Sequence, residues 1–164
     1  MMRAELQEIM SKVTIDILEK LAFMFAFPYE GEPRNSMVAG SVSFTGPFSG
    51  TLVMTISIET LQELADNMLG LDDGEETTEN QRSEALKETV NVICGNLLPA
   101  IAGDEVIFDI GVPGVLPVGQ EMKRGAGISD ALEPSAKVNL DFDEGQCVLF
   151  LYLDGEIPKD VVSP

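Results

Sequence analysis

The chain has 164 residues, 45% of them hydrophobic, which is enough for one domain with a substantial core. Its net charge is −18, with 10 Lys and Arg against 28 Asp and Glu, so nucleic acids and anionic membranes are unfavourable partners. Histidine is absent, which excludes His-dependent catalytic triads, HExxH zinc sites and imidazole bases. We expect a single domain over residues 1–155 and a frayed C-terminal tail over residues 156–164.

The cysteines and the hydropathy pattern predict a cytoplasmic protein. Cys94 and Cys147 cannot form a zinc cage without histidine partners, and we expect both to be small core residues without a disulfide between them. The longest apolar run, Leu21–Phe27, is much shorter than the ~20 residues of a membrane-spanning helix. The opening residues are mixed polar and lack the pattern of a secretory signal.

The first third of the chain predicts a helix followed by a β-hairpin. Apolar residues recur at steps of three and four over residues 6–24, which is typical of an amphipathic helix, and Pro28 follows its end. Residues 38–44 and 52–58 alternate between apolar and smaller side chains, with turn residues 46–50 between them. We therefore expect a hairpin with one buried face.

The rest of the chain predicts two helices and about four strands. After residue 58 the expected elements are a short helix over 60–69, an acidic solvated loop over 71–80, a long helix over 81–102, a strand over 106–110, an extended stretch to 128, and strands over 138–142 and 147–153. The last strand is apolar on both faces, which is typical of the sheet centre or a subunit contact. Tight turns between the strands imply the α+β class, with a largely antiparallel sheet and long helices packed on one face.

The long helix carries a polar ridge opposite its apolar stripe. At 100° per residue, four positions fall within an arc of roughly 60°: Glu84, Glu88, Asn91 and Gly95. A solvated helix face is the simpler interpretation from periodicity alone. Gly95 argues against this interpretation, because a glycine inside a helix destabilises it by ~1 kcal/mol relative to alanine. A solvated helix face does not require a glycine. The ridge is therefore a candidate site at which another molecule approaches the helix closely.

The ridge also resembles a known family. The sequence Glu88-Thr-Val-Asn91-Val-Ile-Cys-Gly95-Asn is similar to the signature helix of the CheC/CheX/FliY chemotaxis phosphatases, which carries Glu-x-x-Asn and an Ile-x-Gly-Asn-like run. Residues 38–53 resemble the family's first hairpin, and residues 108–115 resemble the strand that bears its downstream proline. The resemblance covers roughly residues 5–155 in the same order. The single Glu-x-x-Asn motif points to the CheX branch, because the CheC branch usually carries two.

Two positions depart from the family pattern. Glu84 stands where the family has Asp or Ser, and Pro113 lies one position nearer to Asn91 than the family's proline does. We take Glu84, Gly95 and Pro113 as candidate substrate-binding residues. Each also has a plain structural interpretation. Glu84 would be a solvated acid near the helix N-terminus, Gly95 a site of close helix packing, and Pro113 a turn that ends a strand.

The resemblance implies dephosphorylation of the aspartyl-phosphate on a CheY-like response regulator. An acyl phosphate is reactive, so such an enzyme must mainly position a water in line with the P–O bond. Asn91 would hold this water and a phosphoryl oxygen, while Glu88 would pair with a lysine of the regulator. No cofactor would be bound by this chain, since Mg²⁺ would come with the regulator.

The family also bears on assembly and on an alternative function. CheX-type members form homodimers by joining sheets, which fits the doubly apolar strand at 148–153. The alternative is a non-catalytic scaffold on the same fold, either response-regulator-binding or flagellar-switch-like. Glu84, in place of Asp or Ser, would then reflect drift after loss of activity.

Overall fold

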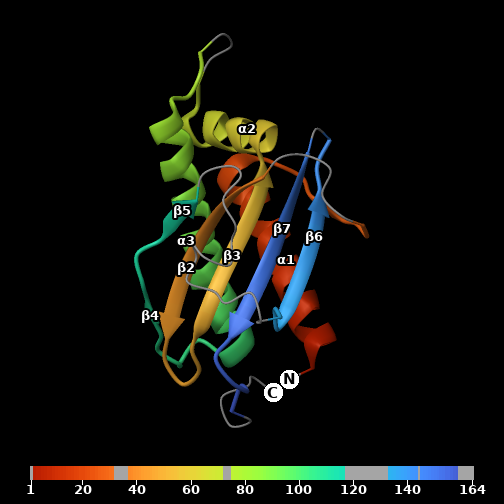
Figure 1. The fold of residues 1–164 in the computed structure, drawn as a ribbon, viewed down its shortest axis with the longest axis vertical. Coiled ribbons are helices and arrows are strands. Elements are labelled where there is room, and N and C mark those ends of the chain that lie inside the picture. Colours follow the sequence, from red (N-terminus) through yellow and green to blue (C-terminus); the bar gives the residue numbers. More distant parts are fainter. Residues whose placement is uncertain (1, 32–36, 72–74, 117–132, 144, 159–164) are drawn as a thin grey trace.

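The fold is an antiparallel sheet with two long helices side by side on one face (Figure 1). The computed structural model describes residues 2–31, 37–71, 75–116, 133–143 and 145–158. The long helices are α1 (Arg3–Ala22) and α3 (Glu79–Ala102), and the shorter α2 (Ile58–Leu69) lies across one end of the sheet. This arrangement confirms the predicted α+β class.

The sheet of the described residues has the order β1-β6-β7-β3-β2, and both β4 and β5 pair with β2. Every pairing is antiparallel. The strands are β1 (Phe27–Pro28), β2 (Met37–Thr45), β3 (Gly50–Ser57), β4 (Asp109–Ile110), β5 (Gly114–Leu116), β6 (Ala136–Asp141) and β7 (Gln146–Leu153).

The helices end at identifiable caps. Phe23 adopts the left-handed conformation that closes α1, and its N–H donates to the Glu19 carbonyl. Gly70 closes α2 in the same conformation, directly after the end predicted for this helix at residue 69. At the start of α3, the Thr78 hydroxyl and the Gln81 side chain bond each other's backbone N–H, which forms a capping box. This box starts α3 earlier than its apolar periodicity indicated.

The hairpin of β2 and β3 is confirmed, but the prediction that only one of its faces is buried is wrong for β3. Leu52, Met54 and Ile56 pack in the main core. Val53 alternates with them and is fully buried in a second cluster, with Ala39, on the other face of the sheet. Leu116, Phe150 and Tyr152 pack against this second cluster, so side chains cover both faces of β3.

The strand predicted over residues 106–110 is also wrong in extent. Only Asp109–Ile110 pairs with β2, and a second short strand follows at Gly114–Leu116. Phe108 is instead part of an aromatic cluster, with its ring centroid 4.9 Å from that of Phe48 and 6.0 Å from that of Phe44. Its apolar character therefore reflects packing at the end of the sheet. Residues 117–128 of the expected extended stretch lie outside the described residues.

The doubly apolar last strand is β7, which pairs with β3 on one side and β6 on the other. Its central place in the sheet accounts for its composition. Cys147 in β7 and Cys94 in α3 are buried free thiols, as expected. Burial raises the pKa of Cys94 to about 12 and also raises the pKa of Cys147.

Two features at the margins of the fold were not predicted. β1 is too short for a recognisable alternation, and its proline is tolerated because the strand lies at the sheet edge. Ile157, which we assigned to the tail, is buried in the main core. Residues 159–164 lie outside the described residues, so the boundaries of the domain stay a prediction.

Candidate functional site

The helix that carries the ridge is held tightly against the sheet. A Cβ on Gly40 of β2 would come within 2.8 Å of the Leu86 Cγ, so this glycine lets α3 approach the strand closely. The apolar stripe of α3, predicted to face inward, is buried at Leu86, Val90, Ile93, Leu97 and Ile101. The polar ridge is therefore fixed on the outer side of α3.

The two predicted catalytic residues lie together on this ridge, three residues apart. Glu88 is exposed and Asn91 is half-buried. Within the described part of the chain, neither side chain has a hydrogen bond or an ion pair. The Glu88 carboxylate and the Asn91 carboxamide thus face the same direction, and both are available to form hydrogen bonds with another molecule. Such a pair can bind a cation through Glu88 and a water or an oxyanion through Asn91.

Glu84 differs from Glu88 because it has a partner. Its Oε1 lies 3.2 Å from Lys87 Nζ in an exposed ion pair. Glu84 is exposed, as its structural interpretation predicted, but it lies beyond the first turn of α3, which begins at Glu79, so the helix dipole does not account for it. Among the described residues, Glu88 is therefore the carboxylate of the ridge that has no ion pair.

Gly95 leaves open space at the C-terminal end of the ridge. A Cβ there would come no closer than 4.0 Å to any described neighbour, the nearest being Ile110 Cδ1. Close helix packing therefore does not explain this glycine in the described structure. Pro99, four residues further along α3, has no N–H to donate to the Gly95 carbonyl. Sequence reasoning missed this effect, although the Gly-x-x-x-Pro spacing signals it.

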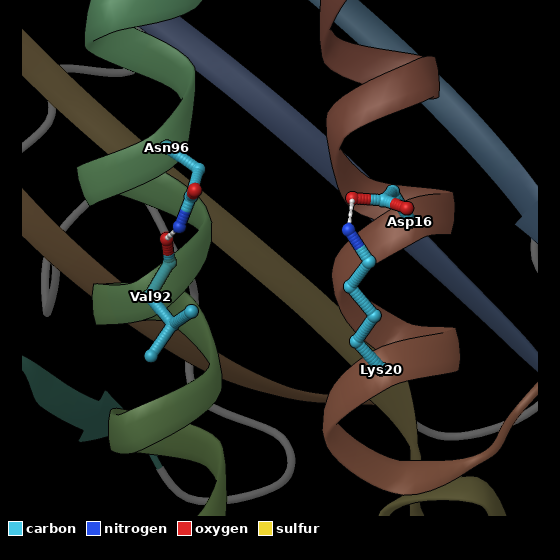
Figure 2. A network of polar contacts seen from close by, with 4 residues as sticks. All are labelled: Asp16, Lys20, Val92 and Asn96. Atoms are coloured by element: carbon cyan, nitrogen blue, oxygen red, sulfur yellow. Dashed lines mark hydrogen bonds and ion pairs between the residues drawn. The ribbon is translucent and has the colours of Figure 1, made fainter.

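Asn96, which follows Gly95 in the motif, is satisfied within its own helix. Its Nδ2 donates to the Val92 carbonyl at 2.8 Å. Figure 2 shows this bond running along α3, beside the ion pair of Asp16 and Lys20 on α1. Asn91 is thus the motif's carboxamide that is available for a bound molecule.

Pro113 lies near the other end of the ridge, in the connection between β4 and β5. It lines a groove of about 660 Å³ together with Ser83 and Lys87 of α3 and Ile58 of α2. The structure therefore brings Pro113 beside the N-terminal half of α3, whereas Ile110 is the neighbour of Gly95. Lys87 connects the groove with the ridge, because it lines the groove and pairs with Glu84.

The described residues include neither a cluster of metal ligands nor a membrane-spanning helix. No group of three or more Cys, Asp or Glu side chains is placed there to hold a metal ion. In the same part of the chain, no helix combines the length and the apolar character needed to cross a membrane.

Comparisons with known proteins agree with this architecture. A family model described as chemotaxis phosphatase CheX matches residues 38–124. The crystal structure of CheX from Desulfovibrio desulfuricans has a TM-score of 0.71 at 19% identity, covering 92% of this chain and 99% of the other. The crystal structure of CheX from Vibrio vulnificus has a TM-score of 0.72 at 19% identity, covering 94% of this chain and 99% of the other.

A third similar structure is a complex. It is the CheX–CheY–BeF3–Mg²⁺ complex from Borrelia burgdorferi, with a TM-score of 0.66 at 18% identity, covering 90% of this chain and 97% of the other. At these identities the structural likeness establishes the fold alone. No curated protein matches the chain significantly in sequence.

Proposed function

Since the chain belongs to the CheX family of chemotaxis phosphatases, we propose that it hydrolyses the aspartyl-phosphate of a CheY-like response regulator. The observation that carries the proposal is the Glu88–Asn91 pair, which is outward-facing and without a partner among the described residues. The CheX of Borrelia burgdorferi, crystallised with CheY, supports a receiver domain as the partner. The ridge stands on a long helix fixed to the sheet, so it can enter a shallow active site as a rigid element.

Asn91 positions the attacking water in this proposal. Its carboxamide oxygen accepts a hydrogen bond from the water, and its amide nitrogen donates to a phosphoryl oxygen. The water oxygen attacks phosphorus, the bond to the aspartyl oxygen breaks, and the products are inorganic phosphate and the free aspartate. An acyl phosphate has a good leaving group, so alignment of the water supplies most of the acceleration. This role suits a chain that contains no histidine to act as a base.

Glu88 acts as a docking group. A carboxylate at the water's position would repel the phosphoryl oxygens, so Glu88 pairs instead with a lysine of the regulator. Its exposed carboxylate has no competing cation among the described residues, unlike Glu84, which is bound to Lys87. This pair holds the phosphorylated partner in register with Asn91.

The remaining candidate residues shape the surface around the pair. Gly95 gives the partner close access to the helix backbone, because open space lies beside it. Pro113 and the groove next to it receive part of the regulator's surface at the other end of the ridge. Glu84 acts through Lys87, which links the ridge to that groove.

The regulator supplies Mg²⁺ in this scheme, and the chain acts as a cytoplasmic homodimer. Only the family supports the homodimer. The apolar composition of β7, which we related to a dimer contact, is explained by the position of this strand between β3 and β6. Light scattering across a concentration series tests it. A dimer mass supports the proposal, and a monomer mass at every concentration contradicts it.

The alternative function is a non-catalytic scaffold that binds a response regulator or belongs to a flagellar switch. Glu84 favours it, because this position carries Asp or Ser in the family and an ion-paired glutamate here. Phosphate release from a Mg²⁺-loaded, phosphorylated receiver domain, measured together with binding, separates the two. Faster phosphate loss with the wild-type chain supports the enzyme. Binding without faster loss supports the scaffold.

A further inference from the structure

Three phenylalanines are exposed together after the end of α1. Phe23, Phe25 and Phe27, hereafter the phenylalanine patch, expose 76%, 63% and 62% of their surface, while Met24 and Ala26 between them are buried. The larger apolar side chains thus face outward and the smaller ones inward, which is the reverse of what burial favours. Packing among the described residues gives no reason for this arrangement.

The segment that carries the patch is firmly held. Phe23 has φ 55°, a left-handed conformation that is uncommon for a bulky residue. Its N–H donates to the Glu19 carbonyl at 2.9 Å, and the Asn67 side chain of α2 donates to the Ala22 carbonyl at 2.8 Å. At the other end, Phe27 belongs to β1, which pairs with β6. The patch is therefore a preformed surface, and little ordering would be needed to bind a partner.

The patch borders a cavity whose lining is apolar and acidic. The cavity has a volume of about 350 Å³ and is also lined by Phe142, Glu63 and Asp143. This volume lies within the range of about 300–1,000 Å³ that is usual for ligand pockets. Asp143 is exposed and has no hydrogen bond or ion pair among the described residues, whereas Lys20, one turn before Phe23, is ion-paired with Asp16 at 2.9 Å (Figure 2). The cavity therefore favours an apolar group with a positive charge beside it.

The patch is separate from the Glu88–Asn91 ridge. It lies at the β1–β6 edge of the sheet, while β4 and β5, which flank the ridge, lie at the opposite edge (Figure 1). A molecule in this cavity would leave the ridge free.

We propose that the phenylalanine patch binds a segment of a partner protein in which large apolar side chains are flanked by Lys or Arg. The apolar side chains fill the cavity between the phenylalanines, and a flanking cation pairs with the Asp143 carboxylate at the rim of the cavity. A second copy of this chain that docked through the same patch would bring a like-charged rim to the cavity, so it is disfavoured as the occupant. An anionic membrane is disfavoured for the same reason.

The test measures binding of synthetic amphipathic helical peptides to the full chain at physiological salt. One peptide has leucine on one face and lysine on the other; two matched peptides replace either the lysines by glutamate or the leucines by alanine. Only the leucine–lysine peptide should bind tightly. The double variant Phe23→Gly/Phe25→Ser should weaken its binding at least about tenfold, and Asp143→Lys should weaken it as well. The control Ile107→Ser, at an apolar residue 82% exposed outside the patch, should bind like the wild type.

Several outcomes would overturn the proposal. These are no binding of the leucine–lysine peptide, equal affinity of the wild type and the double variant, or equal binding of the alanine–lysine peptide. Conversion of a dimer to a monomer by the double variant would identify a second copy as the occupant instead. Binding to phosphatidylcholine–phosphatidylserine vesicles that the double variant loses would identify a membrane. The double variant should remain folded by circular dichroism, since both positions are exposed and glycine suits the left-handed backbone at Phe23.

Discussion

Replacing Gly95 by alanine should raise the stability of the fold and lower the affinity for the regulator. The added Cβ would lie 4.0 Å from its nearest described neighbour, Ile110 Cδ1, so no atom has to move. Alanine is favoured over glycine inside a helix by ~1 kcal/mol, so Gly95→Ala should stabilise the chain by about 0.5–1 kcal/mol. For a chain of this size, that gain corresponds to a rise in melting temperature of roughly 1–4 °C. If a partner must reach the bare backbone here, its affinity should nevertheless fall.

Gly40→Ala is the matched control, because it is the same substitution at a crowded site. Its Cβ would lie 2.8 Å from Cγ of Leu86, a fully buried side chain with little freedom to retreat. Overpacking of this kind costs about 1–3 kcal/mol, so Gly40→Ala should lower the urea midpoint while Gly95→Ala raises it. Urea unfolding and binding of a phosphorylated receiver domain measure both effects. Destabilisation by Gly95→Ala, or stabilisation with unchanged receiver affinity, would refute the reasoning about Gly95.

Three further predictions concern strain, burial and charge. Phe23→Gly should raise the free energy of unfolding by roughly 1 kcal/mol in urea titration, because it relieves a left-handed conformation and removes a side chain that is 76% exposed. An unchanged or lower value would contradict this. Cys94 and Cys147 should resist alkylation by iodoacetamide at pH 8 until the chain is unfolded, because both thiols are buried and their pKa values are raised, that of Cys94 to about 12. Mass spectrometry measures the labelling, and rapid labelling of the folded chain would contradict this prediction. Stopped-flow association with an acidic receiver domain should be no slower at higher salt, because the chain carries a net charge of −18, and a steep loss of rate would contradict this.

The long, periodic elements were predictable from the sequence because their patterns follow directly from burial. The apolar stripe of α3 indicates a helix packed on a sheet, and the apolar residues on both faces of β7 indicate a strand at the centre of the sheet. The motif on α3 likewise placed Glu88 and Asn91 on one outward ridge.

The short and context-dependent features were not predictable. β1 and β4 have two residues each, too few for a period, and their pairing depends on strands distant in sequence. The ion pair of Glu84 with Lys87 depends on side-chain conformations that spacing leaves open. The exposure of the phenylalanine patch was not predicted either, because a run of apolar residues does not by itself show which side chains face outward.

The central claim is that Asn91 aligns the water while Glu88 docks the regulator. The most direct test is single-turnover phosphate release from a Mg²⁺-loaded, phosphorylated receiver domain, with receiver affinity measured in parallel, for the wild type, Asn91→Ala and Glu88→Ala. We expect Asn91→Ala to lose most of the acceleration, on the order of 10²-fold or more, while it still binds the receiver. Glu88→Ala should lose affinity as well as rate. Full acceleration by Asn91→Ala would contradict the account.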